Sequence, residues 1–327
     1  MPRLDHYWQS LNPVALALLP LALLFASAAA LRRGAYRVGL LRRRRFDVPV
    51  VVVGNITVGG TGKTPLVVWL TRHLRSHGWR PGIVSRGYGG RASHWPQQVR
   101  ADSDVGVVGD EAVMLAEATG CPMCVGPDRP AAVQALLDHA NVDIVISDDG
   151  LQHYALARNL EIVVVDGQRR LGNGLPLPAG PLREPRSRLR GVDIVVVNGE
   201  ASGDGECAMA MRPGNVTGLR NEAVARLQSF AGRQVHAVAG IGNPTRFFDM
   251  LRDHGLEVIE HCFDDHHRFR AADLSFDPAL PVLMTGKDAV KCRRLPCDNC
   301  WVVGVEAQPD ARFVDRLNLA LKDLVNG

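Results

Sequence analysis

A glycine-rich segment near the start of the chain ends in a lysine and a threonine. Residues 54–64 read Gly-Asn-Ile-Thr-Val-Gly-Gly-Thr-Gly-Lys-Thr, directly after the valine run 50–53. Glycine lets backbone amides turn toward a phosphate, the lysine reaches the β- and γ-phosphates, and the last hydroxyl is a Mg²⁺ ligand. The strict spacing of such loops requires glycine at position 57, where this chain has threonine. We predict a phosphate-binding loop whose nucleotide contacts come from Ile56, Thr57, Val58, Gly59, Gly60, Thr61, Gly62, Lys63 and Thr64.

Two adjacent acids close a second apolar run. Residues 143–150 read Asp-Ile-Val-Ile-Ser-Asp-Asp-Gly, so Asp148 and Asp149 stand at the end of an expected strand. A protein with a phosphate-binding loop places its Mg²⁺-orienting carboxylate at such a position. A helix cap or a tight turn is the alternative interpretation. Neighbouring side chains at a strand end point in different directions, so we expect the two acids to have different tasks.

Acid–base candidates occur at two distant places. Asp110 follows a glycine and opens an expected helix, where a capping role is the alternative. Residues 264–267 read Asp-Asp-His-His, which fits a solvated surface, a metal site or an acid–base pair. Transfer to a hydroxyl needs a base, and a carboxylate paired with an imidazole supplies one. The sequence does not say whether His266 or His267 meets Asp110.

Two further motifs carry weaker signals. Residues 172–185 are rich in glycine and proline, which predicts an ordered loop with Arg183 and Glu184 facing the phosphates and metal; surface exposure is the alternative. Two Cys-x-x-Cys pairs, at 121/124 and 297/300, lie far apart in unlike contexts, so no zinc site is expected. Seven cysteines in a long chain fit a reducing compartment and exclude a disulfide scaffold.

The elements that must position these residues alternate along the chain. Short β-branched runs at 48–53, 82–85, 142–147, 161–165 and 192–197 predict strands, and amphipathic stretches at 63–77, 111–119 and 129–140 predict helices. Continuous apolar strands are typical of a parallel sheet covered on both faces. Residues 200–228 are rich in turn formers and suggest a boundary, after which a smaller α/β part follows. We predict a phosphate-loop core over 46–215 and a C-terminal α/β domain over 216–327.

An apolar segment precedes this core. Residues 14–31 carry no charge, and as a helix they would extend about 27 Å, close to the thickness of a bilayer's hydrocarbon core. A cleaved signal peptide and a buried core helix are alternatives, but the preceding charge is weak and no polar face exists. We favour a membrane anchor over 1–45, either spanning or partly inserted. The arginines that follow would lie against anionic headgroups on the cytoplasmic side: Arg32, Arg33, Arg37, Arg42, Arg43, Arg44 and Arg45.

Composition limits the remaining classes. The 327 residues are 46% hydrophobic with a net charge of +4, which excludes intrinsic disorder. The basic character comes from the arginine cluster, and no second basic patch accompanies it. No nucleic-acid partner is therefore expected.

In this order, the motifs closely resemble one family, the tetraacyldisaccharide 4'-kinases, also called lipid A 4'-kinases. The resemblance runs nearly end to end. It rests on Gly-Gly-Thr-Gly-Lys-Thr-Pro at 59–65, Ser-Arg-Gly-Tyr-Gly-Gly at 85–90, Gly-Asp-Glu at 109–111, Asp-Asp-Gly-Leu-Gln-His at 148–153, Gly-Asn-Gly at 172–174 and Pro-Ala-Gly-Pro-Leu-Arg-Glu at 178–184. Thr57 is the residue that this family shows at that position. Where the family has Thr-Glu-Lys-Asp, this chain has Thr-Gly-Lys-Asp at 285–288.

The resemblance implies a bacterial inner-membrane enzyme whose catalytic domains face the cytoplasm. It would transfer the γ-phosphate of ATP, with Mg²⁺, to the 4'-hydroxyl of an acylated disaccharide 1-phosphate in lipid A synthesis. By matching motifs, Asp110 is the base and His266 supports it. Thr64, Asp148, Asp149 and Glu184 are assigned to the metal, and Arg86, Gln152 and Arg183 to the substrate. The rival class is a membrane-bound nucleotide switch, which would need no base for an acceptor hydroxyl.

Overall fold

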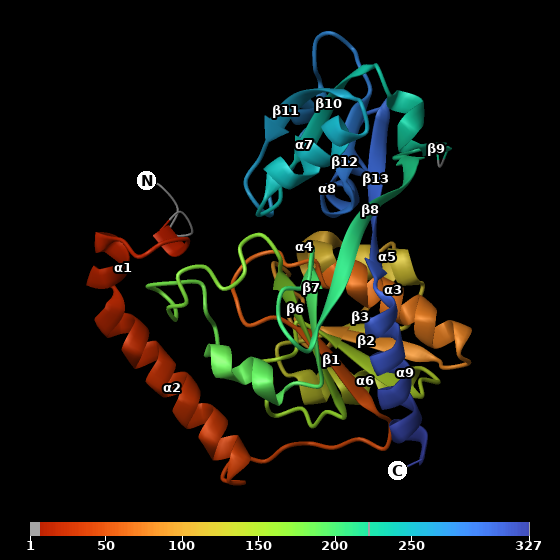
Figure 1. The fold of residues 1–327 in the computed structure, drawn as a ribbon. Coiled ribbons are helices and arrows are strands. Elements are labelled where there is room, and N and C mark those ends of the chain that lie inside the picture. Colours follow the sequence, from red (N-terminus) through yellow and green to blue (C-terminus); the bar gives the residue numbers. More distant parts are fainter. Residues whose placement is uncertain (1–6, 222, 327) are drawn as a thin grey trace. The chain divides into compact units, whose positions relative to one another are not determined.

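The computed structural model describes residues 7–221 and 223–326, which divide into two compact units. The first unit runs to Arg86, resumes over Cys121–Ala210 and includes the chain from Ala307 onward. The second consists of Gly87–Gly120 and Met211–Glu306. This division differs from the sequence-based boundary at 215/216, because it assigns residues 87–120 to the second unit and the last helix to the first. Figure 1 follows the chain through both units.

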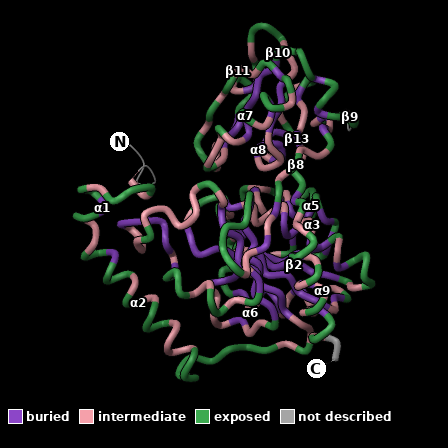
Figure 2. The backbone as a smooth tube through the Cα atoms, viewed as in Figure 1, coloured by how far each residue is buried: buried purple, intermediate pink, exposed green. Residues whose placement is uncertain are grey.

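The first unit is built on a parallel sheet, which confirms the predicted α/β fold. Its strands are ordered β4-β2-β5-β1-β6-β7, and the buried apolar runs predicted from the sequence form five of them. Their bounds are β1 Val50–Gly54, β2 Pro81–Ser85, β4 Met123–Val125, β5 Ile144–Asp148, β6 Leu160–Asp166 and β7 Ile194–Asn198. Every residue of β1, β2, β5 and β6 is buried, because helices cover both faces. In Figure 2 these strands form the buried centre of the unit.

Helices on opposite faces hold this sheet. α6 (Arg129–His139) buries Ala132, Val133 and Leu136 in one cluster with Val50 and Val52 of β1. α3 (Lys63–Ser76) follows β1 and contacts β1, β2 and β5, and right-handed crossovers place it on the other face. α9 (Ala311–Asn326) contacts β7 and buries Phe313 and Leu317. The phosphate-binding loop thus lies between a buried strand and a buried helix.

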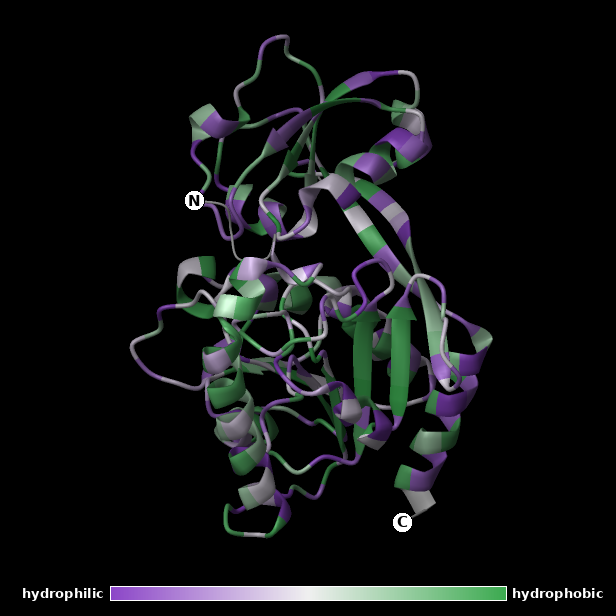
Figure 3. Ribbon diagram, turned by 60° about the vertical axis from the view of Figure 1, so that its left-hand side comes forward, coloured by the Kyte–Doolittle hydropathy of each residue, from purple (hydrophilic) through white to green (hydrophobic). Residues whose placement is uncertain are grey.

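The apolar N-terminal segment forms two helices. α1 (Pro13–Ala17) and α2 (Leu19–Arg37) are separated by Leu18. Figure 3 shows the hydropathy along the chain. Arg33 of α2 forms an ion pair with Glu184, and the ring of Tyr36 lies 6.0 Å from that of Tyr154. Across residues 7–221 and 223–326, no helix combines the length and the apolarity that crossing a bilayer requires.

The second unit is a smaller sheet with its own core. Its strand order is β11-β10-β12-β13-β8, and α7 (Pro244–Asp253) packs Phe247, Phe248 and Leu251 into its core. The strands are β8 Glu206–Gly218, β10 Gln234–Ala239, β11 Glu257–Cys262, β12 Val282–Thr285 and β13 Cys300–Pro309, with the short β9 Val224–Arg226 beside β8. The remaining elements are β3 Gln97–Val99, α4 Val105–Val108, α5 Asp110–Thr119 and α8 Gly286–Cys292, with short 3-10 turns at Arg186–Gly191, Leu227–Phe230 and Ala271–Leu274.

The segment 200–228, in which the sequence suggested a boundary, is largely β-structure. β8 is a 13-residue strand in which Cys207 and Met209 are buried on alternate positions. Pro213 and Gly214 interrupt this alternation in the sequence and conceal it. β8 belongs to the first unit as far as Ala210 and to the second from Met211.

Candidate active site

The phosphate-binding loop connects the end of β1 to the first turn of α3. Gly59 and Gly62 both adopt positive φ, +102° and +93°, which suits glycine. Ile56, Thr57 and Thr61 are buried, whereas the tip at Gly59 and Gly60 is exposed. Around the tip, backbone amides and the N-terminus of α3 are therefore available to an anion.

A second segment braces this loop. Val58 N donates to Pro181 O at 2.9 Å, and Arg183 N donates to Ile56 O at 2.7 Å. Gln152 Nε2 donates to Asn55 O at 3.0 Å. The predicted glycine- and proline-rich loop is thus ordered, and it holds the base of the phosphate-binding loop.

Asp149 lies between two cations. Its carboxylate is 3.4 Å from Lys63 Nζ and 3.1 Å from Arg183 Nη1. Burial raises the pKa of Asp149, but the charges of Lys63 and Arg183 have the larger opposite effect, and the net pKa falls to about 2. Asp149 also has a left-handed backbone, with φ +47°. The lysine that would bind phosphate is paired with an acid that is ionised at neutral pH.

Asp148 is the buried neighbour of this acid, at the last position of β5. It pairs in register with Val53 of β1, so the acid lies beside the residue that enters the loop. The buried guanidinium of Arg129 donates to Asp148 O at 3.3 Å and to Gly126 O at 2.7 Å. The two adjacent acids therefore have different surroundings, as their positions at a strand end predicted.

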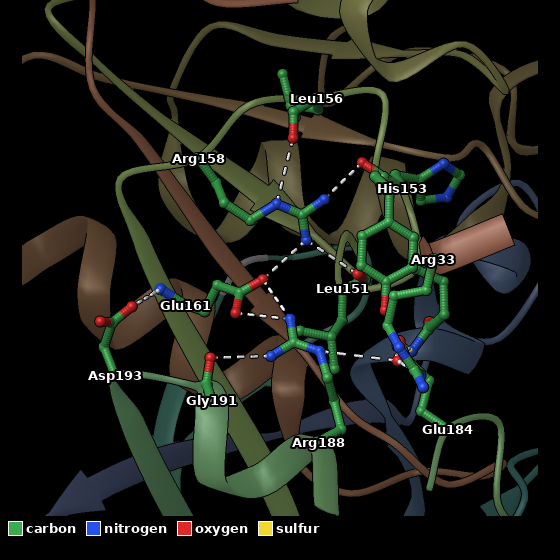
Figure 4. A network of polar contacts seen from close by, with 12 residues as sticks. Arg33, Leu151, His153, Leu156, Arg158, Glu161, Glu184, Arg188, Gly191 and Asp193 are labelled. Carbon is green, nitrogen blue, oxygen red and sulfur yellow. Dashed lines mark hydrogen bonds and ion pairs between the residues drawn. The ribbon is translucent and has the colours of Figure 1, made fainter. Parts of the chain in front are cut away.

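Glu184 is buried within side-chain contacts from several segments. One carboxylate oxygen accepts from Gln152 at 3.2 Å, and the other accepts from Tyr154 at 2.5 Å and Arg33 at 3.3 Å. Arg188 Nε approaches the second oxygen to 3.7 Å. Figure 4 shows Glu184 at one side of this cluster, beside Arg33 and Arg188. Glu184 thus connects α2 to Gln152, and through Gln152 to the phosphate-binding loop.

A second buried acid completes this network. Glu161 of β6 accepts from Arg158 at 3.0 Å and from Arg188 at 2.5 Å and 2.6 Å. Its own backbone amide donates to Asp193 at 2.7 Å (Figure 4). Burial alone would lower the pKa of Arg188, but its contacts with Glu161 and Tyr154 raise it. Arg188 is therefore a fixed cation shared by Glu161 and Glu184.

The second unit brings Asp110 and His266 together. Asp110 is the first residue of α5 and is 5% exposed, and its Oδ2 lies 3.0 Å from His266 Nδ1. His266 follows β11 with φ +62°, and its ring lies 5.1 Å from that of Tyr88. His267 instead contacts Asp273, at 3.1 Å. In the structure, His266 is therefore the histidine that meets Asp110.

A glycine makes the entry to α5 possible. Gly109 has φ +93°, and a Cβ there would lie 2.3 Å from Tyr88 O. The backbone amide of Glu111 donates to Asp110 Oδ1 at 2.9 Å, which leaves Oδ2 directed to His266. This local structure fixes the orientation of the carboxylate.

Each member of the pair favours the ionised form of the other. Burial raises the pKa of Asp110, but the hydrogen bond from His266 and the charge of Lys287 outweigh it, so the net pKa is lowered. The hydrogen bond to Asp110 raises the pKa of His266 above its usual value. Asp110 is consequently an anionic hydrogen-bond acceptor at neutral pH.

Known proteins share this arrangement of sequence and fold. The family model for tetraacyldisaccharide-1-P 4'-kinase matches residues 14–322. The chain belongs to this family. The tetraacyldisaccharide 4'-kinase of Nitrosococcus oceani is 53% identical over 94% of this chain and 91% of its own length, and that of Alkalilimnicola ehrlichii is 53% identical over 99% and 98%. The crystal structure of LpxK from Aquifex aeolicus in complex with ATP has a TM-score of 0.82 and 25% identity, and covers 95% of this chain and 99% of that one.

Family membership confirms the resemblance and the predicted activity: the chain is a tetraacyldisaccharide-1-phosphate kinase. The structure places the residues predicted for this kinase in two groups. Lys63, Asp148, Asp149, Gln152 and Arg183 lie with the loop in the first unit, and Asp110 and His266 lie in the second. Arg86 is exposed at the end of β2. The roles assigned to these residues remain predictions.

Some residues of the site were not foreseen. Tyr154, Arg158, Glu161 and Arg188 form the network around Glu184, and only the four-residue spacing of Glu184 and Arg188 hints at it. His153 belongs to a motif, but its sequence position predicted no role for it. Burial and the charges of Arg129 and Arg86 lower its pKa to about 3, so its ring is neutral at pH 7.

The structure also shows how the possible metal ligands and two of the cysteines are arranged. Over the described ranges 7–221 and 223–326, no cluster of three or more His, Cys, Asp and Glu side chains is arranged to hold a metal. Cys297 and Cys300 form a disulfide, which joins residues three apart and is no scaffold for the fold.

Proposed function

We propose that this kinase transfers the γ-phosphate of ATP to the 4'-hydroxyl of its tetraacyldisaccharide 1-phosphate, and that Asp110 accepts the proton of that hydroxyl. The bond between the γ-phosphorus and the bridging oxygen breaks, the acceptor oxygen bonds to phosphorus, and the proton passes to the carboxylate. The observation that carries this assignment is the contact of 3.0 Å between Asp110 and His266. An ionised, buried carboxylate held by an imidazole fits a base for an alcohol.

The phosphate side of the reaction is assigned to the first unit. Lys63, the amides around the loop tip at 59–62 and the N-terminus of α3 would bind the phosphates and neutralise the charge that develops during transfer. Lys63 lies 3.4 Å from Asp149, and its ammonium group carries three N–H donors, so it can contact a phosphate as well. Arg183 holds the same acid from the other side.

The chemistry of the donors also fits Mg²⁺. Asp148, Asp149 and the hydroxyl of Thr64 are hard oxygen ligands beside the loop. When bound, the ion would supply positive charge that stabilises the transferring phosphoryl group. Glu184 fits this set less well, because its oxygens already accept from Gln152, Tyr154 and Arg33. We assign Glu184 to the support of the loop.

We also propose that α1 and α2 bind the surface of the bacterial inner membrane from the cytoplasm. Leu21, Leu23, Leu24 and Leu31 of α2 are 57–75% exposed, an unusual density of apolar surface. Arginines lie at the end of α2 and just beyond it, where anionic headgroups would meet them. A substrate with four acyl chains stays in the bilayer, so binding at its surface raises the rate of encounter.

Transfer of labelled phosphate tests the reaction. We would measure transfer from γ-labelled ATP to a tetraacyldisaccharide 1-phosphate in detergent micelles for wild type, Lys63→Ala and Asp110→Asn. Loss of transfer in both variants, with ATP binding retained in Asp110→Asn, supports the proposal. Wild-type hydrolysis of ATP without labelled lipid would favour the nucleotide switch.

Flotation with liposomes tests the membrane proposal. Leu21→Asn/Leu24→Asn/Leu31→Asn should bind vesicles containing anionic lipid at least tenfold more weakly than wild type. Leu319→Asn is the matched control, because Leu319 is an exposed leucine on α9. Equal binding by the triple variant and this control would contradict the role of α2.

A further inference from the structure

One lysine outside the predicted site contacts the chain neighbours of both Asp110 and His266. Lys287 stands at the second position of α8, and its side chain is only 13% exposed. Its Nζ lies 2.9 Å from Glu111 Oε1 and 3.0 Å from Asp265 Oδ1. An ammonium group between two carboxylates in a largely buried position is a strongly held bridge.

The two carboxylates are the chain neighbours of the pair. Glu111 follows Asp110 on α5, and Asp265 precedes His266 in the loop after β11. Asp265 Oδ2 also lies 3.8 Å from His266 Nε2. Lys287 therefore joins α5 to the loop after β11 at the place where the pair forms, and the two members of that pair are 156 residues apart in sequence.

We propose that Lys287 is a positioning residue for phosphoryl transfer, which holds α5 and the loop 263–267 in register and keeps the Asp110–His266 pair in its proton-accepting form. This inference rests on the proposed role of Asp110 as the base. Lys287 contacts the neighbours of the reacting groups, so it acts through them.

The charges around Asp110 indicate what loss of Lys287 would do. Lys287 and Lys291 face Asp110 from α8, His266 faces it from the loop after β11, and Glu111 lies on its own helix. Lys291 pairs with Asp288 at 2.8 Å, so it is held away from the bridge. The charge of Lys287 lowers the pKa of Asp110 and also opposes the raised pKa of His266. Without that charge, both groups would bind protons more tightly.

The experiment compares pH profiles of kcat/KM and kcat for lipid phosphorylation. In Lys287→Met we expect kcat to fall roughly tenfold or more, because the pair loses its alignment. We expect the limbs of the profile to move about half a pH unit to higher pH, because a nearby positive charge is gone. Lys287→Arg keeps the charge and should restore most of kcat and the original limbs. KM for ATP should change little in either variant.

Controls separate this role from a merely structural one. Lys322→Met removes an exposed lysine from α9 and should match wild type in rate and profile. If Lys287→Met does not fold, Lys287→Gln keeps a hydrogen-bond donor without the charge and carries the same expected shift. An unchanged kcat, or a lower kcat with unmoved limbs, would overturn the proposal.

Asp110→Asn, measured in parallel, separates the two assignments. Full transfer by Asp110→Asn would refute the base, whatever Lys287 does. Loss of transfer in Asp110→Asn together with an unmoved profile in Lys287→Met would refute the role of Lys287 alone.

Discussion

Lys63 Nζ lies 3.4 Å from a carboxylate oxygen of Asp149, so the cation of the phosphate-binding loop is paired with an acid at the end of β5. Arg183 contacts the same carboxylate from the opposite loop. One acid thus holds two cations that would otherwise repel each other, which suits a site that must receive a highly charged anion.

Asp149→Asn should lower kcat/KM by roughly 100-fold, because the site loses its ionised acid while two cations remain. Steady-state kinetics at several Mg²⁺ concentrations measure this effect. Asp143→Asn removes an acid that pairs with Arg80 at the surface and is the matched control. A smaller loss in Asp149→Asn than in the control would contradict the assignment.

The depressed pKa of Asp149 has a further consequence for stability. The ordinary pKa of an aspartate is near 3.9. Because the folded value is about 2, the stabilisation is present above the ordinary value and is lost as the pH falls toward 2. Acid unfolding of Asp149→Asn should therefore depend less steeply on pH between roughly 4 and 2 than that of wild type.

The two adjacent histidines should behave differently. His266→Gln should reduce kcat by roughly 100-fold or more, because Asp110 loses its partner, whereas His267→Gln should stay within about threefold of wild type. NMR titration checks the cause: the pKa of His266 is raised in wild type and should fall in Asp110→Asn, which removes the carboxylate. Equal losses in the two glutamine variants would argue against the pair.

The contact between Asp110 and His266 also determines how the stability of the fold changes with pH. A raised histidine pKa contributes stability that is complete below about pH 6.5 and is lost as the pH rises through the folded value. Chemical denaturation of wild type should show this decrease, and His266→Gln should lack it.

Removal of Glu184 should destabilise the first unit. Glu184→Ala removes the acceptor of Arg33 and Tyr154 and leaves Arg188 with Glu161 as its carboxylate, and breaking a buried pair in this way costs about 3–5 kcal/mol. Thermal unfolding measures the change. Glu260→Ala removes an exposed partner of Arg252 and should cost less than about 1 kcal/mol. Similar losses in the two variants would show that the network contributes little.

Two glycines with positive φ give a matched pair for the entry to α5. Gly109→Ala forces its Cβ against Tyr88 O, and we expect displacement of Asp110 and a loss of at least tenfold in kcat. Gly120, at the other end of α5, has φ +58°, and a methyl group there would meet no atom within 4 Å. Gly120→Ala should cost about 1 kcal/mol and leave kcat unchanged. Equal activity of the two alanine variants would contradict this account.

The parallel core could be predicted from the sequence, whereas the contact partners of the polar residues could not. The strands around β1 are continuous apolar runs, and burial on both faces leaves such runs little choice of structure. β8 was not predicted, because Pro213 and Gly214 interrupt its alternation of buried and less buried residues. Contacts across the fold were also out of reach: Asp110 and His266 are 156 positions apart, and no local pattern distinguishes His266 from His267.

Most contacts of Glu184 could not be predicted from its motif. Its position in an ordered loop predicted a role near the phosphates, and Gln152 does link it to the loop. Its other contacts come from α2, Tyr154 and Arg188, none of which belongs to its motif. Hydrogen-bond partners from several segments depend on the assembled fold, which one local motif does not contain.

The interleaving of the two units affects how the chain folds during synthesis. The second unit takes Gly87–Gly120 from inside the first, and the first is completed only by α9. While a ribosome makes the chain, Asp110 has no histidine partner until His266 is synthesised, and the surface that Phe313 and Leu317 cover stays open until α9 has emerged. Neither unit is a single stretch that folds as it leaves the exit tunnel. The nascent kinase therefore depends on late, long-range closure, the stage at which chaperones meet exposed apolar surface.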